Sequence, residues 1–267
     1  MKRYFLLLLL CLLSLWRLGK ELLILTTLSQ GDMSWLPFIA AIMMLIIVYV
    51  VPISGMTVWV LRQRGLSIAA YFWALILGIY VIGQPAGFIN NLFASKLLAL
   101  FPDTLVLKEW ISSIVPPIVE EGLKLGLAIV LVYLLRVKSI WIALAIGVGV
   151  GLGFQLSEDY TYVLSTLVDH QLTPIQEAFS RLSSSFAGHW LLTALMTGAW
   201  FLLIKMKVKN ALVKWYLIGP ILLHMIWNTS IVDQSIVLKI GLIMVSWLLL
   251  GNLYHLVLKM EKEDRNL

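Results

Sequence analysis

Two adjacent glutamates lie inside a long apolar stretch of this chain. Glu120 and Glu121 follow the pair Pro116 and Pro117, and Lys124 comes in the next turn. An acidic residue at the centre of a membrane helix costs roughly 2.5–3.5 kcal/mol. A chain that keeps two of them beside a lysine is expected to use them. We therefore take Glu120, Glu121 and Lys124 as the start of a candidate active site.

Three further apolar stretches carry polar residues that lipid disfavours. The first carries Phe154, Glu158 and Asp159. The second carries Arg181, His189 and Thr193, and the third carries His224 and Asn228. Residues four apart share one face of a helix, so such pairs can point into a bundle. The pairs are Glu120 with Lys124, His189 with Thr193, and His224 with Asn228. Arg181 is interpreted as a helix-end residue whose charged group reaches the interface.

Two glutamates and two histidines in one pocket suit the activation of water. A buried carboxylate next to a second one can act as a general base, and a histidine can orient the water or protonate a leaving amine. Asn228 can donate a hydrogen bond to a developing oxyanion. Lys124, one turn from Glu120, is expected to keep that carboxylate ionised.

The same residue types can bind a divalent metal, because glutamate and histidine are normal zinc ligands. The candidate metal ligands are Glu158, His189 and His224. No H-E-x-x-H motif supports the zinc hypothesis. The single cysteine, Cys11, excludes a thiolate site and an internal disulfide.

The elements that must position these residues are membrane helices. The chain has 267 residues, of which 61% are hydrophobic and 13% charged, and its mean hydropathy is +0.95. This balance is typical of a multi-spanning membrane protein, and the absence of a basic face argues against nucleic-acid binding. Stretches of about 20 apolar residues can cross a bilayer as helices. We predict about eight of them: Tyr4–Leu28, Leu36–Leu61, Ser67–Phe93, Glu109–Leu135, Ile140–Leu167, Phe179–Ile204, Ala211–Val232 and Ser235–Met260.

Most lysines and arginines fall in clusters between alternate stretches. The clusters are Lys2 and Arg3; Arg62 and Arg64; Arg136 and Lys138; Lys205, Lys207, Lys209 and Lys214; and Lys259, Lys262 and Arg265. The positive-inside rule then places both termini in the cytoplasm and predicts a multi-pass protein of the cell membrane. Helix rise puts the ionisable groups of four spans about 12 to 16 Å from their outer ends, in the outer half of the bilayer.

We find no internal repeat, so residues 1–267 are expected to form one integral-membrane domain, with a motif-bearing core at about 109–232. The first stretch resembles the front of a signal peptide but lacks a small-residue cleavage site, which favours its retention as a span. The segment Phe93–Leu107 has helical spacing and is expected at the outer interface. In the fifth stretch, Gly147 with Gly151 and Gly149 with Gly153 form G-x-x-x-G patterns on two faces, which predicts a tightly packed central helix.

Four short motifs together resemble the PrsW family of intramembrane proteases. Glu120-Glu121-Gly122-Leu123-Lys124 is similar to the family's E-E-x-x-K motif, and the segment from Phe154 to Asp159, followed by Tyr162, to its F-x-x-x-E-N-x-x-Y. The segment from His189 to Thr193 resembles its H-x-x-x-T, and His224 to Asn228 its H-x-x-W-N. The motifs occur in the family's order on consecutive spans. Asp159 departs from the pattern, since the family usually has Asn there.

The resemblance implies a membrane-embedded endopeptidase whose substrate is a membrane-anchored protein, cut near the extracytoplasmic side. The family's namesake makes the first cut in an anti-sigma factor. By motif, Glu120 or Glu121 would activate water, His189 and His224 would complete the water site or bind a metal, and Asn228 would stabilise the oxyanion. The resemblance leaves open a glutamate mechanism and a metal mechanism with zinc.

Three alternatives remain at this stage. A distantly related CAAX or Abi-like protease would act in peptide maturation or bacteriocin self-immunity. A proton- or ion-coupled transporter would use the buried Glu, Lys and His residues as a relay, although the repeated halves and paired broken helices of many transporters are not evident. A catalytically inactive scaffold would bind membrane segments.

Overall fold

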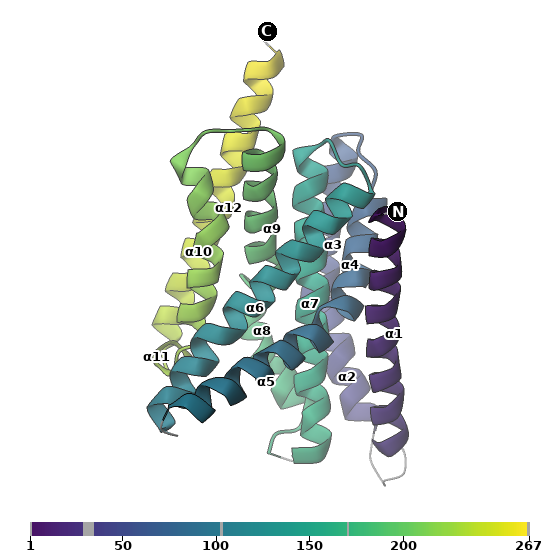
Figure 1. Ribbon diagram of the computed structural model, residues 1–267, viewed down its shortest axis with the longest axis vertical. Coiled ribbons are helices and arrows are strands. Elements are labelled where there is room, and N and C mark those ends of the chain that lie inside the picture. Colours follow the sequence, from purple (N-terminus) through teal and green to yellow (C-terminus); the bar gives the residue numbers. More distant parts are fainter. Residues whose placement is uncertain (1, 29–34, 102–103, 170, 266–267) are drawn as a thin grey trace.

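The chain folds into a bundle of helices in the computed structural model, which describes residues 2–28, 35–101, 104–169 and 171–265 (Figure 1). Within these residues every secondary-structure element is a helix, which confirms the predicted class. The elements are α1 (Lys2–Leu28), α2 (Trp35–Leu45), η1 (Ile46–Val50), α3 (Val51–Gln63), α4 (Ala69–Val81), α5 (Gly83–Leu100), α6 (Leu105–Leu134), α7 (Ile140–Asp169), α8 (Pro174–Ser185), α9 (His189–Trp200), η2 (Phe201–Lys205), α10 (Ala211–Trp227), α11 (Ser230–Asp233) and α12 (Ile236–Arg265).

Several of these helices are suited to a membrane. By length and composition, three continuous helices in the described residues can cross one, at Trp35–Gln63, Ile140–Asp169 and Ile236–Glu263, and a bent pair formed by α4 and α5 can be a fourth. α1 and α6 are nearly as long or longer, but each carries three or more charged residues. The chain is therefore a helical protein with three to four candidate spans by this criterion.

The third predicted stretch, Ser67–Phe93, is not one straight helix. It bends by 41° between α4 and α5. Pro85 explains the position of the break, because a proline ring clashes with the carbonyl four residues earlier, which is that of Val81, the last residue of α4. α5 then continues to Leu100 and α6 begins at Leu105, so the described part of the segment Phe93–Leu107 includes the end of α5 and the start of α6.

The sixth predicted stretch, Phe179–Ile204, is also interrupted. α8 begins at a capping box of Thr173 and Gln176 and ends at Ser185, and α9 begins at His189 with Gly188 as its N-cap. The seventh, Ala211–Val232, ends earlier than expected, because α10 stops at Trp227 and only the short α11 follows. The interruptions at Gly188 and after Trp227 both lie beside motif histidines.

α7 is the central helix of the bundle. In its most apolar window 83% of the residues are buried, compared with 28% in Trp35–Gln63 and 11% in Ile236–Glu263. Its glycines face two different helices, as the spacing predicted. Cβ atoms on Gly147 and Gly151 would meet the backbone of α9, and Cβ atoms on Gly149 and Gly153 would meet that of α4. Small residues thus let both neighbours approach α7 at backbone contact.

Two charged residues of α1, Arg17 and Glu21, are paired inside the protein. Arg17 lies 2.6 Å from Glu21, and the Tyr160 hydroxyl of α7 donates to Glu21 at 3.0 Å. Arg17 is buried and lies near Gly83, at the bend between α4 and α5. The charged residues of this pair therefore face the bundle and not lipid.

Both ends of the chain lie at the same end of the bundle, together with the connections that follow α3, α6 and α9 (Figure 1). These connections carry basic residues, including Arg64, Arg136 and Lys207. α8 and α11 lie toward the opposite end. The alternation of basic connections seen in the sequence thus corresponds to one end of the folded molecule.

The substitution Gly149→Ala is expected to destabilise the protein. The added Cβ would lie 2.7 Å from the Tyr71 carbonyl oxygen and 2.9 Å from the Ala74 Cβ, so α4 must move away from α7. Overpacking of this kind costs about 1–3 kcal/mol. Thermal unfolding of the purified protein in detergent measures the effect.

The matched control is Gly126→Ala on α6, where an added Cβ meets nothing within 4 Å. This change should leave the melting temperature unchanged or raise it slightly, because alanine favours a helix over glycine. Equal melting temperatures for the two variants would contradict the close packing of α4 on α7.

Candidate active site

α6 brings three predicted residues, Glu120, Glu121 and Lys124, into the interior. Glu121 and Lys124 are 0% exposed, and Glu120 is 7% exposed. The two prolines before them stay within a continuous helix. Ser113, one turn earlier, donates its hydroxyl to the backbone oxygens of Glu109 and of Asn228, which ties α6 to the end of α10.

Lys124 pairs with a different glutamate from the one that the spacing suggested. Its Nζ lies 2.6 Å from Glu121 Oε1 and 2.7 Å from His189 Nδ1, with the Phe154 ring 4.4 Å away. The expected pair of Lys124 with Glu120 is therefore not the contact that forms. The cause is geometric, since residues three apart also share a helix face and Glu121 points inward with Lys124.

The partners of the two histidines fix where their protons lie. A lysine ammonium has only donors, so His189 Nδ1 must accept from it, and Nε2 then donates to Glu158 Oε2 at 3.1 Å. His224 Nδ1 lies 2.9 Å from Glu121 Oε1, a carboxylate that accepts, so Nδ1 carries the proton. The other nitrogen, Nε2, lies 4.0 Å from Glu120 Oε2 and keeps its lone pair.

A second group of charges continues from Glu158. Arg181 of α8 lies 2.8 Å from Glu158 Oε2 and donates through Nε to Asp159 Oδ1 at 2.6 Å. The Tyr49 hydroxyl donates to the other oxygen of Asp159 at 2.9 Å. The interpretation of Arg181 as an interfacial helix-end residue is therefore wrong, because two carboxylates hold its guanidinium against α7. Asp159, the position that departs from the motif, thus shares this arginine with Glu158.

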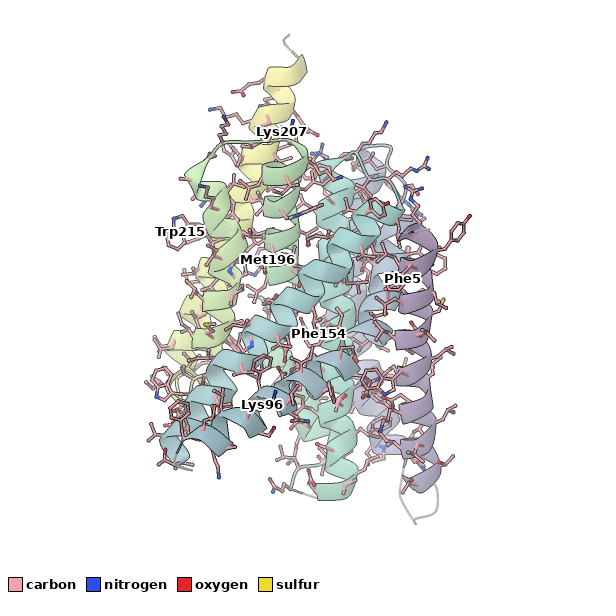
Figure 2. All side chains as sticks on the ribbon, viewed as in Figure 1. Phe5, Lys96, Phe154, Met196, Lys207 and Trp215 are labelled. Carbon is pink, nitrogen blue, oxygen red and sulfur yellow. The ribbon has the colours of Figure 1, made fainter. Side chains whose placement is uncertain are left out.

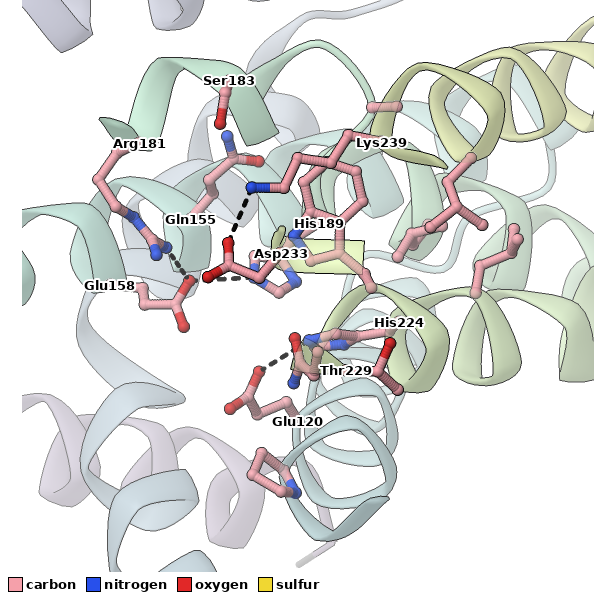
Figure 3. A pocket seen from close by; sticks show the side chains of 18 of the residues that line it. Glu120, Gln155, Glu158, Arg181, Ser183, His189, His224, Thr229, Asp233 and Lys239 are labelled. Carbon is pink, nitrogen blue, oxygen red and sulfur yellow. Dashed lines mark hydrogen bonds and ion pairs between the residues drawn. The ribbon is translucent and has the colours of Figure 1, made fainter. Parts of the chain in front are cut away.

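These residues surround a cavity of about 660 Å³. Its lining includes five predicted residues: Glu120, Glu158, His189, His224 and Asn228. Figure 3 shows Glu120 and His224 on one side of it, and His189 and Glu158 on the other. The predicted residues Glu121, Lys124, Asp159 and Thr193 are buried outside this lining, and Phe154 packs its ring 5.0 Å from that of His189. Asp233 and Lys239, paired at 2.8 Å, also line the cavity.

The sequence pattern of a known family covers this whole site. The family described as PrsW family intramembrane metalloprotease matches residues 66–253. This chain belongs to that family. No match was found among curated proteins or among solved structures. As a PrsW family member the protein is a membrane-embedded protease, and its substrates are proteins in the membrane.

The family description implies a metal, and the residues present fit one. Glu120, His189 and His224 offer ligand atoms that all lie within 4.8 Å of one another. Glu120 Oε2 is buried and has no hydrogen-bond partner among the described residues, so a cation would satisfy it. Carboxylate and imidazole are the usual zinc donors. This group contains Glu120 where the sequence suggested Glu158, because Glu158 is held by Arg181.

Two carboxamides in the PrsW site were not predicted. Asn90 of α5 lines the cavity, with Nδ2 3.5 Å from Glu120 Oε1. Gln155 of α7 also lines it. Both lie in apolar helices, where a carboxamide side chain indicates a hydrogen-bonding role inside the bundle, but neither occupies a motif position. Only the bend between α4 and α5 and the packing of α7 on α9 bring them to this cavity.

The substitution Lys124→Met is expected to destabilise the protein strongly. It leaves the carboxylate of Glu121, which is fully buried, without its closest cation. Removing one partner of a buried ion pair typically costs about 3–5 kcal/mol, so we expect a loss of that size in thermal unfolding. The double change Lys124→Met with Glu121→Gln should recover part of the loss, because no unpaired charge then remains.

Lys96→Met on α5 is the control, since Lys96 is exposed. It should melt with the wild type. A Lys124→Met protein that also melts with the wild type would show that the buried pair does not stabilise the fold.

Proposed function

We propose that the protein hydrolyses peptide bonds of membrane-anchored proteins at the cavity formed by α6, α7, α9 and α10. One observation carries the proposal: Glu120, His189 and His224 come from three helices and meet within 4.8 Å. The same residues line a cavity of about 660 Å³, in a chain of a protease family. Helix packing alone does not require three ionisable groups to share a cavity inside an apolar bundle.

We propose that the chain crosses the cell membrane eight times and that residues 1–267 form one domain. Three to four spans are supported by length and composition. The charged helices α1 and α6 would add two, because Arg17 pairs with Glu21 and Lys124 with Glu121 inside the bundle. The shorter apolar helices His189–Lys205 and Ala211–Trp227 would complete the set. The basic connections share one end with both termini, so that end is assigned to the cytoplasm (Figure 1).

Cleavage is then expected near the extracytoplasmic side. Phe154, whose ring contacts His189, lies in the half of the bundle away from Lys207 (Figure 2). A membrane-anchored anti-sigma factor, the substrate that the resemblance to the family's namesake implies, is a substrate of the proposed kind. The cavity lining combines acidic, neutral polar and apolar side chains, and its lysine and arginine residues are Lys239 and Arg181.

In the proposed mechanism Glu120 activates the water. Its Oε2 and His224 Nε2 are both acceptors and lie 4.0 Å apart, so one water molecule can donate to both. Glu120 takes a proton as the water oxygen bonds to the peptide carbonyl carbon. It then gives the proton to the amide nitrogen as the C–N bond breaks. Asn228 lies on the cavity wall, where its side chain can hydrogen-bond the substrate.

Glu121 has a positioning role in this proposal. Its Oε1 contacts both Lys124 Nζ and His224 Nδ1, which fixes the histidine with its lone pair toward Glu120. Lys124 and Glu158 fix the orientation of the His189 ring in the same way, through contacts with Nδ1 and Nε2 respectively. In the alternative metal mechanism a divalent ion such as zinc would be held by Glu120, His189 and His224, and it would supply Lewis-acid polarisation of water and carbonyl in place of the base role of Glu120. His189 would exchange one of its present partners for the ion.

The first test compares membrane-protein fragments in cells that express equal amounts of wild type or of Glu120→Gln. This change removes the proposed base and leaves the pair of Glu121 with Lys124 intact. We expect at least one fragment that ends in the extracytoplasmic juxtamembrane region and is present only with wild type. Quantitative mass spectrometry of membrane fractions identifies it.

Glu263→Gln, an exposed carboxylate on α12, is the matched control and should leave that fragment unchanged. Identical fragment patterns for wild type and Glu120→Gln under several envelope stresses would reject the proposed proteolysis. Ion flux in proteoliposomes that depends on Glu120, with no cleavage, would instead indicate a transporter.

Metal content gives an independent test. Purified protein is expected to hold about one zinc per chain, and His224→Ala should lose it because one of the ligand atoms is gone. Elemental analysis by mass spectrometry measures the ratio. His255→Ala, an exposed histidine on α12, should keep the metal. Fully active protein with no bound metal would eliminate the metal role and leave the glutamate mechanism.

A further inference from the structure

The packing of α7 on α9 places Gln155 at the start of α9. A Cβ on Gly147 would meet Thr193, Ala194 and Thr197, and a Cβ on Gly151, one turn later, would meet His189 and Trp190. The two helices therefore run in opposite directions. A residue one turn later on α7 contacts residues about one turn earlier on α9. Gln155, the next residue on this face of α7, lies one turn beyond the first residue of α9.

The amide of Gln155 is buried and has no partner within the described part of the chain. The residue is 2% exposed and lines the cavity. Neither its nitrogen nor its oxygen has a hydrogen-bond partner among those residues, so turning the amide over does not satisfy it. Buried polar groups are nearly always paired, and an exception in a cavity points to a bound group that completes the pairing.

The N-terminus of α9 is open toward the same place. Gly188 is its N-cap and has no side chain to cap the helix. The first backbone bond of α9 runs from the Leu191 N–H to the Gly188 oxygen, so the N–H groups of His189 and Trp190 have no acceptor within the helix. These groups and the helix dipole favour an anion. Gly188 and His189 both line the cavity.

We propose that Gln155 and the N-terminus of α9 together bind the carbonyl oxygen of the scissile peptide bond and stabilise the oxyanion that forms on it. This role rests on the proposed proteolytic function. The amide N–H of Gln155 and a backbone N–H of α9 give the two donors that such a site requires. Figure 3 shows Gln155 across the cavity from Glu120 and His224, the two residues between which the proposed water would lie.

The helix dipoles favour this position over Asn228 for the oxyanion. Asn228 is the C-cap of α10, where the last carbonyl groups give a partial negative charge. Its own backbone oxygen accepts from Ser113. An oxyanion is stabilised at the start of a helix and destabilised at the end of one. Asn228 is therefore assigned to contacts with the neutral parts of the substrate.

The test uses Gln155→Leu and Gln155→Glu, which keep the approximate shape of the side chain. The probe is the purified membrane protein whose cleavage depends on Glu120, mixed with full-length enzyme in detergent. Loss of one oxyanion donor lowers kcat by about 10²–10³, and we expect this for Gln155→Leu with little change in KM. Gln155→Glu should be at least as slow, because a carboxylate donates no hydrogen bond and repels the oxyanion.

Thr197→Val is the matched control. Thr197 is also fully buried and its hydroxyl also lacks a partner among the described residues, but it is not part of the cavity lining. Its variant should retain wild-type kcat. Thermal unfolding of all variants separates a loss of chemistry from a loss of fold, and the near-isosteric Gln155→Met replaces any variant that unfolds.

The outcomes distinguish a failure of the oxyanion role of Gln155 from a failure of the proposed proteolytic function. Gln155→Leu with kcat within about twofold of wild type, or with a raised KM and unchanged kcat, would overturn the oxyanion role while proteolysis stands. An active Gln155→Glu enzyme would also overturn it, because the donor is then unnecessary. If wild type itself cleaves nothing, the proposed function fails and this role fails with it.

Discussion

The site depends on the compensation of charge in the interior of an apolar bundle. Glu121 and Lys124 are completely buried and 2.6 Å apart. In such surroundings neither charge is tolerable alone, so each must keep its partners in fixed directions. Each of these two groups also contacts a histidine: Lys124 Nζ contacts His189, and Glu121 Oε1 contacts His224. The orientation of both imidazoles, and with it the chemistry of the cavity, therefore follows from one ion pair.

This arrangement requires helix backbones to approach very closely. α7 provides that approach through glycines on two faces, toward α9 and toward α4. Glu158 then reaches His189, and Arg181 of α8 reaches Glu158 and Asp159. A larger side chain at the glycines that face α9 would move this helix, and so His189, away from α7 and Glu158. The glycines thus connect packing with catalysis without taking part in the reaction.

The sequence predicted much of this but not its details. Glu120, His189 and His224 could be identified from their isolated positions in apolar stretches, because an ionisable group is costly in lipid and is kept there mainly where it has a function. The two glycine faces of α7 were also predicted, since spacing alone determines a helix face. The predicted partner of Lys124 was wrong, because residues three and four apart share a helix face and only the tertiary contacts decide between them. The predicted role of Arg181 was wrong because its partners, Glu158 and Asp159, lie on another helix. Asn90 and Gln155 were missed for a similar reason, as only the packed helices bring them to the cavity.

Some of the buried polar atoms that lack a partner in the described chain belong to residues that line the cavity, and others, such as Glu121 Oε2 and the Thr193 hydroxyl, lie outside the lining. Glu121 Oε1, Glu158 Oε2 and Asp159, which orient other residues, are fully engaged, whereas Glu120 Oε2 and the amide of Gln155 have no partner in the described chain and belong to residues that line the cavity. The interrupted backbone at Gly188 lies there as well, consistent with the rule that irregular backbone at membrane depth borders a cavity. An unpaired group is unfavourable in the resting protein, but that cost is recovered when a reacting molecule supplies the missing partner. The unpaired groups that line the cavity are therefore preorganised for charge that appears only during reaction.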